Sequence, residues 1–462
     1  MRYISTRGLA PVLSFEETVL TGLASDGGLY LPERIPKLSH KELIELNNCS
    51  YADSAYRIMR LFIDDIEEKP LKDLIKKSYT RFCNDSIVPI KQISNNHFLL
   101  DLFTGPTFAF KDIALQLMGN LIDYLLKKRC EKAVIMGATS GDTGSAAISG
   151  FCDCKNLDIF ILHPHNMISD IQRRQMTTIK KDNIHNIAIK GTFDDAQAIV
   201  KESFNKRGFF FKGRRLIAIN SINWARILAQ TVYYIVSAIS VGAPYREISF
   251  TVPSANFGNI FAGYIAYKMG LPIKQLVVAS NVNNILHRII EYNDFSRRQL
   301  INTIAPAMDI VVSSNFERLL FYAYEKDSNA IKHLFDKFHK EHYAIIDKKP
   351  LNKIRNLFYS TSVHDKTILS IISQIYKRNG IVVDPHTAIG LMAAERCNNS
   401  PEIPMITLAT AHPAKFYDTI IKAGIELQMP NSLKELLQKE ERYCILPATI
   451  NKVHSYMISV CH

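Results

Sequence analysis

The sequence is short of the features that would assign it to several special classes of protein. Eight cysteines are scattered over 462 residues, which is too few for a disulfide scaffold. Only Cys152 and Cys154 lie close together, and no histidine or cysteine cluster accompanies them, so the pair does not indicate a metal site. The first residues lack the basic-then-apolar pattern of a signal peptide. We therefore expect a cytoplasmic protein with no metal.

Long apolar runs and dense basic blocks are also missing. The longest apolar run, residues 227–243, is interrupted by glutamine, threonine and serine, so it predicts a buried helix rather than a membrane span. The net charge is +12, but Lys and Arg are spread along the chain, and the short basic groups flank apolar segments as solvated helix ends do. We expect no nucleic-acid or membrane partner. The charge would suit a small anionic substrate.

From about residue 111, helical and strand-like patterns alternate. Leucine and isoleucine recur every four residues over 111–128, which predicts a helix with a broad buried face. Residues 132–139 form a continuous apolar run, as in a buried parallel strand. Further strands are expected at 157–164, 183–191, 215–220, 247–255, 273–280, 380–388 and 405–413, and helices over 169–178, from Asp194 and from Ile222. The alternation predicts an α/β fold with two open, mostly parallel sheets.

The first part of the chain differs from the rest. Residues 1–90 are helix-rich, with a turn at 24–32, and are expected to form a separate N-terminal domain. The division expected for the whole chain is this domain, an α/β domain over 91–245, a second α/β domain over 246–425, and a tail over 426–462.

One lysine stands out because of what precedes it. The stretch 102–112, LFTGPTFAFKD, carries rings and small residues up to Lys111 and Asp112, and a strongly apolar segment follows. A lysine in such a place is most often a solvated residue that opens a helix. The alternative is that the aromatic residues desolvate the amine, because burial disfavours the charged form and leaves a nucleophile near neutral pH.

Three loops follow expected strands, at the edge where open α/β sheets bind ligands. Residues 137–147, GATSGDTGSAA, are small and hydroxylated and run into a helix, as a loop that binds an anion at a helix N-terminus does. They match neither a P-loop nor Gly-x-Gly-x-x-Gly. Residues 253–263, PSANFGNIFAG, also suit a phosphate, and Thr410 ends a buried strand. Each loop taken alone could be an ordinary strand–helix turn.

Taken together, these parts point to one chemistry. A lysine behind aromatic rings, two anion loops and a strand-end hydroxyl are the parts of an enzyme that uses pyridoxal phosphate. The lysine would form an imine, one loop would hold the cofactor phosphate, the other would receive a substrate carboxylate, and the hydroxyl would meet the pyridine nitrogen. Imine formation needs an unprotonated amine, which apolar walls favour.

At this point the chain resembles the threonine synthase family, in its long form with an extra N-terminal domain. The resemblance is carried by YISTRG (3–8), DGGLYLP (26–32), GPTFAFKD (105–112), GATSGDTGSAA (137–147), GTFDDAQ (191–197), NSINWARILAQ (220–230), SSNFERLLF (313–321), DPHTAIG (384–390) and TAHPAKF (410–416). It implies pyridoxal-phosphate fold type II, which is tryptophan-synthase-β-like, with pyridoxal 5'-phosphate as cofactor. The implied reaction turns O-phospho-L-homoserine and water into L-threonine and phosphate, by β,γ-elimination and then water addition, in a monomer or homodimer.

Carried over by motif, the resemblance implies a role for each residue of the expected site. Lys111 would bind the cofactor and move protons at Cα and Cβ of the substrate, and Phe110 would flank the cofactor. Its phosphate would be held by Ser254, Ala255, Asn256, Phe257, Gly258 and Asn259, with Thr410 at the pyridine nitrogen. The substrate carboxylate would be bound by Thr139, Ser140, Gly141, Asp142 and Thr143. Candidates for the substrate phosphate are Ser5, Thr6, Arg7, Asn223 and Arg226; alternatively, Arg226 lies on the surface of its helix.

Several positions depart from the family pattern, among them Ala305 and Ala307, which stand where the family has serine. Thr104 stands where the family commonly has histidine, and Asn284 stands where it has aspartate. In the phosphate loop, Ala255 replaces a glycine that could take a positive φ, and Asn259 replaces an aspartate. These changes leave three functions open: a threonine synthase, another lyase or dehydratase of this fold, or a cofactor-binding homologue with reduced or lost turnover.

Overall fold

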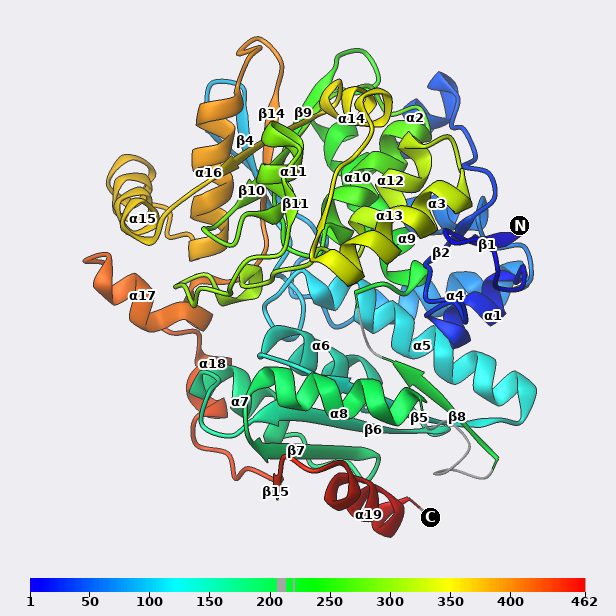
Figure 1. The fold of residues 1–462 in the computed structure, drawn as a ribbon. Helices are drawn as coiled ribbons and strands as arrows, with labels where there is room; N and C mark the ends of the chain where they lie inside the picture. The colour runs from blue at the N-terminus through cyan, green and yellow to red at the C-terminus, as the bar shows by residue number, and fades with distance from the viewer. Residues whose placement is uncertain (206–212, 219–220, 462) are drawn as a thin grey trace. The chain divides into compact units, whose positions relative to one another are not determined.

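The computed structural model describes residues 1–205, 213–218 and 221–461, and these fall into two compact units. The first unit contains residues 1–76, 82–104 and 221–427, and the second contains the described residues of 77–81, 105–220 and 428–462. Figure 1 shows the elements of each. None of the helices over the described residues is long and apolar enough to cross a membrane. The same residues contain no group of three or more His, Cys, Asp or Glu that could hold a metal ion.

The first unit is built on a six-stranded sheet with the order β13-β10-β9-β14-β4-β3 (Figure 1). All neighbouring strands are parallel except β3 and β4. The strands are β3 (Ile90–Ser94), β4 (His97–Asp101), β9 (Ile248–Pro253), β10 (Ile273–Ser280), β13 (Phe358–Ser362) and β14 (Met405–Ala409). Two small antiparallel pairs join β1 (Tyr3–Ser5) to β2 (Tyr30–Pro32) and β11 (Phe295–Ser296) to β12 (Tyr343–Ala344).

Helices surround this sheet and pack on one another. They are α1 (Phe15–Thr21), α2 (His40–Leu46), α3 (Tyr51–Arg60), α4 (Glu68–Tyr79), α9 (Trp224–Ser240), α10 (Gly258–Lys268), α11 (Ile285–Tyr292), α12 (Phe316–Ala323), α13 (Ser328–Glu341), α14 (Lys348–Arg355), α15 (Asp365–Asn379), α16 (Pro385–Cys397) and α17 (Tyr417–Lys422). Short 3-10 turns lie at Pro306–Met308 and Pro413–Phe416. Helix α16 contacts β9, β10, β13 and β14, and α10 packs against α9.

The second unit has a five-stranded, all-parallel sheet with the order β15-β7-β6-β5-β8 (Figure 1). Its strands are β5 (Lys132–Ala138), β6 (Leu157–Pro164), β7 (Ile184–Lys190), β8 (Arg214–Ala218) and β15 (Cys444–Pro447). Its helices are α5 (Lys111–Arg129), α6 (Asp142–Phe151), α7 (Asp170–Thr177), α8 (Phe193–Asn205), α18 (Asn431–Leu436) and α19 (Ile450–Val460). Helices α5, α6, α8 and α19 contact the strands of this sheet, as expected for a parallel sheet, whose faces are covered by helices.

The α/β fold with two mostly parallel sheets is confirmed, and most expected elements lie where the sequence placed them. The apolar run 227–243 is the buried helix α9 rather than a membrane span. The end of the strand expected at 215–220 lies outside the described residues, which show β8 as far as Ala218. The expected division into four consecutive domains stays a prediction.

The strand expected at residues 380–388 is wrong. Residues 381–384 are irregular, and α16 begins at Pro385. The carboxylate of Asp384 accepts hydrogen bonds from the backbone N–H groups of His386 (3.0 Å) and Thr387 (3.4 Å), and so caps the helix. Proline fits the first helical turn because it needs no N–H donor there. The apolar pattern that suggested a strand comes instead from burial, since Val383 belongs to the core cluster of this unit.

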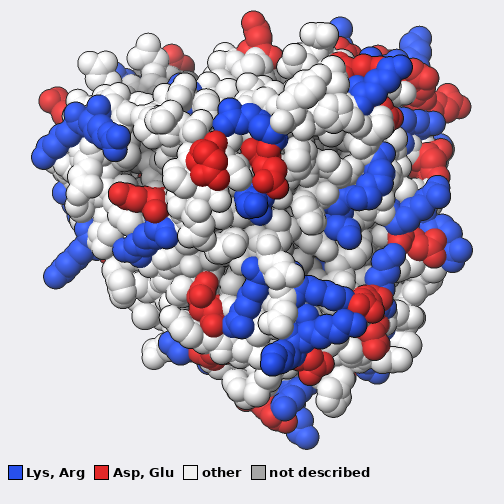
Figure 2. All heavy atoms as spheres, turned by 90° about the horizontal axis from the view of Figure 1, so that it is seen from above, with Lys and Arg blue, Asp and Glu red and all other residues white. Residues whose placement is uncertain are grey.

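Charged side chains do not gather in one large area of a single sign on the face shown in Figure 2. Lys and Arg are spread over this face with Asp and Glu among them, in line with their even distribution along the sequence.

Candidate active site

Lys111 is the first residue of α5, and its neighbours explain why the chain turns into a helix there. Asp112 is fully buried, and its carboxylate accepts hydrogen bonds from the N–H (2.8 Å) and the hydroxyl (2.7 Å) of Thr107. Gly105 lies so close that a Cβ there would be 2.5 Å from the Cβ of Asp112. Asp112 therefore joins the preceding loop to the first turn of α5 and fixes the position of Lys111. The sequence reading assigned no role to Asp112.

The amine of Lys111 has two kinds of neighbour. Its Nζ lies 5.7 Å from the centroid of the Phe110 ring and 3.6 Å from Oδ2 of Asp142, and the side chain is 13% exposed. The aromatic neighbour expected from the sequence is thus accompanied by a carboxylate.

The pairing of Lys111 with Asp142 follows from the packing of α5 against α6. A Cβ on Gly119 would lie 2.0 Å from the carbonyl oxygen of Gly150, and a Cβ on Gly150 would lie 2.5 Å from the carbonyl oxygen of Leu115. The two helices touch backbone to backbone at these glycines. Lys111 precedes Gly119 by as many residues as Asp142 precedes Gly150. The helices therefore run alongside each other in the same direction and begin at the same level.

The loop between β5 and α6 is shaped by its own hydroxyl and glycines. Thr139 is buried, and its hydroxyl accepts the N–H groups of Gly141 (3.0 Å) and Gly144 (2.9 Å). Gly141 precedes α6 with a φ of 143°, a conformation that glycine adopts readily. Ser140 is exposed and Thr143 is half-buried. Thr139 therefore orders the turn, while the start of α6 provides N–H groups without helical partners.

The carboxylate of Asp142 is held from a second helix. Its Oδ1 accepts a hydrogen bond from Nε2 of Gln172 on α7 (2.9 Å), and the Oε1 of Gln172 accepts one from Ser169 (3.0 Å). A Cβ on Gly141 would meet the Gln172 side chain at 2.5 Å. Gln172 was not singled out in the sequence because glutamine on an amphipathic helix carries no distinctive signal.

The expected phosphate loop of the first unit follows β9 and leads into α10. Two of its carbonyl oxygens accept hydrogen bonds from a neighbouring segment. Ala255 O accepts from the hydroxyl of Ser313 (2.8 Å), and Asn256 O accepts from the N–H of Asn315 (3.1 Å). Phe257 has a φ of 60° and precedes α10 without a side-chain cap. The positive φ lies at Phe257 and not at Ala255, so Ala255 carries no strain of that kind. The other expected effect of its Cβ, on the close approach of the backbone to the phosphate, stays a prediction.

This loop fits a phosphate group. The hydroxyl of Ser254 and the Nδ2 of Asn259 are buried and have no hydrogen-bond partner among the described residues. Buried donors of this kind are costly unless a partner is supplied. The first N–H groups of α10 have no partner within the helix, and the helix N-terminus favours negative charge. Two buried donors without a partner among the described residues, one before α10 and one in its first turn, are suited to bind the cofactor phosphate.

Thr410 lies at the same edge of the same sheet. Thr251 of β9 pairs with Thr407 of β14, and both strands then run on in parallel to Ser254 and Thr410. Thr410 is 6% exposed. The register thus places Thr410 beside the phosphate loop, as a residue that faces the cofactor ring would require.

The N-terminal candidates for the substrate phosphate are bound within their own unit. The guanidinium of Arg7 donates to both carboxylate oxygens of Glu317 (3.2 and 3.1 Å), and the hydroxyl of Thr6 donates to the same group (2.5 Å). Ser5 donates to Asp26 (2.8 Å). Bidentate pairing of this kind uses two of the guanidinium N–H groups with which arginine would otherwise hold a phosphate.

The candidates at the start of α9 differ from each other. Asn223 caps the helix by accepting the N–H of Ala225 (3.0 Å), and its amide donates to the carbonyl of Val19 (2.8 Å). Arg226 is 3% exposed, and burial lowers the pKa of its guanidinium to about 10. The alternative that Arg226 lies on the helix surface is therefore wrong.

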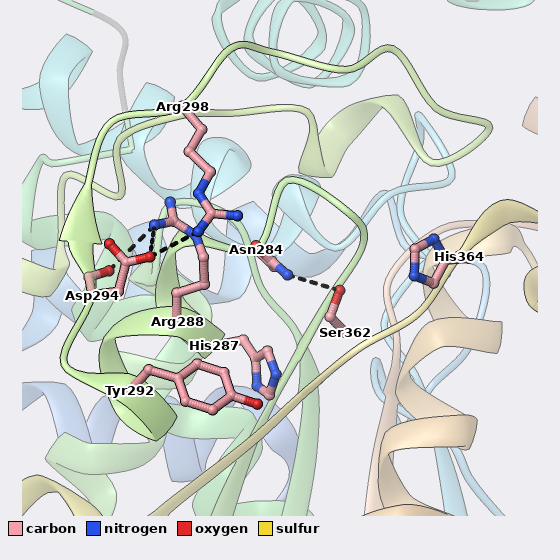
Figure 3. Close-up of a pocket in the computed structure, with 8 residues that line it drawn as sticks. All are labelled: Asn284, His287, Arg288, Tyr292, Asp294, Arg298, Ser362 and His364. Carbon is pink, nitrogen blue, oxygen red and sulfur yellow. Dashed lines mark hydrogen bonds and ion pairs between the residues drawn. The ribbon is translucent and has the colours of Figure 1, made fainter.

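Thr104 and Asn284, which also depart from the family pattern, lie in the first unit. The hydroxyl of Thr104 donates to the carbonyl oxygen of Ile87, so the residue that replaces the usual histidine has a backbone partner. Asn284 donates to Ser362 (3.3 Å) on the wall of a cavity of about 470 Å³, shown in Figure 3. The two arginines of this cavity, Arg288 and Arg298, both bind Asp294 (2.7 and 2.9 Å). None of the residues expected in the active site lines it.

Comparison with known proteins places this geometry in a family. The model for the threonine synthase N terminus matches residues 2–79, the model for pyridoxal-phosphate-dependent enzymes matches residues 86–335, and the model for the threonine synthase C-terminal region matches residues 387–457. The threonine synthase of Pseudomonas aeruginosa is 50% identical over 99% of this chain and 98% of that protein. The chain belongs to the threonine synthase family. The threonine synthase of Saccharomyces cerevisiae is 41% identical over 95% of this chain and 92% of its own length.

Solved structures agree with membership of the threonine synthase family. Pyridoxal-phosphate-bound threonine synthase from Brucella melitensis superposes with a TM-score of 0.97 at 43% identity, covering 100% of this chain and 99% of that one. The yeast threonine synthase gives 0.94 at 37% identity, covering 99% and 98%. A threonine deaminase from Solanum lycopersicum, at 13% identity and a TM-score of 0.53, shares the fold alone. The fold is that of pyridoxal-phosphate enzymes of fold type II, and pyridoxal 5'-phosphate is the cofactor of the family.

Proposed function

We propose that the protein converts O-phospho-L-homoserine and water into L-threonine and phosphate. The observation that carries this proposal is Lys111 at the start of α5, with its amine between the Phe110 ring and the Asp142 carboxylate, in a chain of the threonine synthase family. When bound, the cofactor supplies an electron sink that stabilises negative charge at Cα and Cβ of the substrate.

Each part of the chain then has a definable task. Lys111 would hold the cofactor covalently, and its amine would take and return the protons of Cα and Cβ of the substrate. The Phe110 ring flanks the cofactor and excludes water. The loop from Ser254 to Asn259 binds the cofactor phosphate, and Thr410 faces the pyridine nitrogen.

The loop before α6 receives the substrate carboxylate. The donors there are backbone N–H groups at the helix start, together with the hydroxyls of Ser140 and Thr143, because the Thr139 hydroxyl is engaged within the turn. The Asp142 side chain is negatively charged and is held by Gln172, so it positions the loop and the Lys111 amine instead of binding the carboxylate itself.

For the substrate phosphate, Arg226 is the candidate that the geometry supports best. Its guanidinium is buried, and Asn223 fixes the start of the helix that carries it. Ser5, Thr6 and Arg7 support the site at a further remove, through Glu317 and Asp26. We also propose a cytoplasmic enzyme that acts as a monomer or homodimer, with a small molecule rather than a nucleic acid or membrane as its partner.

The test is to incubate the purified protein with O-phosphohomoserine and to measure phosphate and threonine together. Equal amounts of both are expected. In Lys111→Ala, threonine formation should fall by at least about a hundredfold, because the residue that moves the protons is gone, and borohydride should no longer fix the cofactor to the chain. Lys127→Ala, at the exposed end of the same helix, serves as the control.

Phosphate without threonine would instead indicate a lyase or dehydratase reaction. Bound cofactor with neither product would indicate a homologue that has lost turnover. Threonine formation that survives in Lys111→Ala would remove Lys111 from the reaction.

A further inference from the structure

Two buried tyrosines on α9 converge on one atom of the phosphate loop. The hydroxyls of Tyr233 and Tyr234 donate to the same oxygen, Oδ1 of Asn259, at 2.5 and 2.9 Å. Both tyrosine side chains are fully buried. Neither lies in a motif loop, and the resemblance to the family assigned no role to either of them.

The rings are held so that both hydroxyls reach Asn259. The two rings lie 5.0 Å apart between centroids, and Tyr234 packs edge-on against Phe250 of β9 at 4.9 Å. A Cβ on Gly263 of α10 would lie 2.8 Å from the Tyr234 ring, so glycine at this position makes room for it. Burial raises the pKa of both tyrosines well above the ordinary value, so both remain protonated donors.

This arrangement fixes the orientation of the Asn259 carboxamide. An amide oxygen has two lone pairs, and the two hydroxyls use both. The Nδ2 group must then point away from the tyrosines, and it is buried without a partner among the described residues, like the hydroxyl of Ser254. Asn259 lies in the first turn of α10, so whatever holds its side chain also holds the N–H groups of that turn.

We propose that Tyr233 and Tyr234 are positioning residues for the cofactor phosphate. By binding the oxygen of Asn259, they turn its amide donor and the first turn of α10 toward the phosphate. This inference rests on the proposed function, because it takes the loop from Ser254 to Asn259 as the phosphate site. It also gives a reason for asparagine at this position: an aspartate would accept the same two hydroxyls but would leave a negative oxygen where the amide donor now is.

The test compares pyridoxal 5'-phosphate with pyridoxal, which lacks the phosphate, in titrations of the full-length protein freed of cofactor. The variants are Tyr233→Phe, Tyr234→Phe and the double variant. The control is Tyr322→Phe, which removes a buried hydroxyl that has no hydrogen-bond partner among the described residues. The Tyr322 ring stacks on Phe261 of α10, so this variant also changes a tyrosine that packs on that helix. The phosphorus NMR signal of the bound cofactor is a second readout, because it reports on the phosphate environment without turnover.

We expect the double variant to bind pyridoxal phosphate about tenfold more weakly, the loss expected for about one hydrogen bond to a charged group. Pyridoxal affinity should stay within about twofold, and the phosphorus signal should shift. Asn259→Asp keeps the acceptor for both tyrosines and should also weaken only the phosphorylated form. Tyr322→Phe should match the wild-type protein in both titrations.

Three results would overturn the inference. An equal loss for pyridoxal and its phosphate would show that the tyrosines act through packing alone. Unchanged affinities in the double variant and in Asn259→Asp would show that neither group reaches the phosphate. If the wild-type protein itself does not prefer the phosphorylated form, the assignment of the loop fails, whatever the tyrosines do. Threonine formation from O-phosphohomoserine tests the reaction separately from all three.

Discussion

Asp142 serves two side chains with its two carboxylate oxygens. One oxygen accepts a hydrogen bond from Gln172, and the other lies 3.6 Å from the Lys111 amine. The residue is also the first of α6, where a negative charge is favoured by the unpaired N–H groups. Its charge is therefore stabilised from three directions, and it can hold the lysine and the turn in one arrangement.

We predict that Asp142→Ala leaves the absorbance spectrum of the bound cofactor intact but weakens the response to substrate. The loop that presents N–H groups to the substrate loses its tie to Gln172, and substrate affinity should fall by about tenfold or more, as for a lost charged hydrogen bond. Titration of the spectrum with O-phosphohomoserine measures this. Gln172→Ala removes the same tie while keeping the charge and should show a smaller loss. Release of the cofactor itself in Asp142→Ala would place Asp142 in the cofactor site instead.

At the scale of elements, the contact between α5 and α6 sets the geometry of the second unit. Two glycines let the backbones meet, and the equal spacing from Gly119 to Lys111 and from Gly150 to Asp142 brings Lys111 and Asp142 to one level. A side chain at the contact would separate the helix starts as well as the helix middles.

We predict that Gly119→Ala lowers the free energy of unfolding of the second unit by about 1–3 kcal/mol, as expected for overpacking. The added Cβ would meet the carbonyl oxygen of Gly150, which is backbone and cannot move aside cheaply. Native-state hydrogen exchange of β5 and β6 amides gives the stability, and the fraction of cofactor fixed by borohydride reports on Lys111. Alanine substitution of Lys127, exposed on the same helix, should change neither. A stable variant that still fixes cofactor would show that the helices can separate freely.

A second element-scale contact ties α7 to the C-terminal segment of the same unit. Glu441 accepts hydrogen bonds from Arg173 (2.8 and 3.1 Å) and from Thr177 (2.7 Å). The Arg173 guanidinium is the main reason that the pKa of Glu441 lies below its ordinary value of 4.5; burial opposes it, and the Thr177 hydroxyl adds to the lowering. A lowered pKa means that the bond adds stability above the unfolded-state pKa and loses it as the pH falls through the folded-state pKa.

We therefore predict that Glu441→Gln destabilises the second unit at pH 7 by about 1 kcal/mol, the scale of a partly exposed ion pair. The pair is with Arg173 and, at 3.5 Å, with Arg174. The difference from the wild-type protein should shrink as the pH falls below 4.5 and vanish below the lowered pKa. Hydrogen exchange of α7 at several pH values measures it. Glu440→Gln is the matched control, because Glu440 is exposed and pairs with the exposed Lys180. A pH-independent difference would mean that packing and not charge holds the segment.

Elements with a strong apolar pattern could be predicted from the sequence, whereas elements without such a pattern depend on tertiary contacts. The strands at 157–164 and 273–280 were found at their full length because continuous apolar runs bounded by polar residues admit few other structures. Strand β13 was missed because its sequence, FYSTS, is polar at three of its five positions. Strands β3 and β4 were missed because they precede residue 111, where the alternation of helical and strand-like patterns begins.

The candidate site was predictable where residues share a loop and not where they meet through packing. Lys111 and the loop 254–259 could be named because each is a contiguous motif. The contact between Lys111 and Asp142 needs two glycines in two helix interiors, which carry no signal on their own. Tyr233 and Tyr234 look like ordinary core residues of an apolar helix, and only the position of their hydroxyls separates them from the rest.

At the scale of the whole molecule, the two units are interleaved along the chain. The second unit takes its first residues from 77–81, most of its sheet from 105–220, and its last strand from 428–462. Strand β15 pairs with β7 in parallel, from Cys444 opposite Ile187 to Pro447 opposite Lys190. Val453 and Met457 of α19 belong to the same apolar cluster as Ile187 and Ile189.

We predict that a chain ending at residue 427 aggregates and does not fix the cofactor. The backbone groups of β7 would lose their partner, and an unpaired strand edge is a template for pairing with other chains. The apolar cluster around Ile187 would be exposed as well. Solubility after expression and binding of a hydrophobic dye measure the effect. Val453→Ala, which deletes buried methyl groups but keeps β15, should fold and lose about 1–3 kcal/mol in the second unit. A soluble truncated chain that fixes cofactor would show that residues 428–462 are dispensable.

The late position of β15 has a consequence for how the protein is made. Most of the second unit leaves the ribosome before residue 221, but the strand that covers β7 is synthesised only after the whole of the first unit. The edge of β7 therefore stays unpaired while more than two hundred residues are added between positions 221 and 427. At roughly 5–20 residues per second, that interval lasts tens of seconds at the slow end. The second unit is thus begun before the first is complete and is completed only after it, and a chaperone that shields the β7 edge would act in that interval.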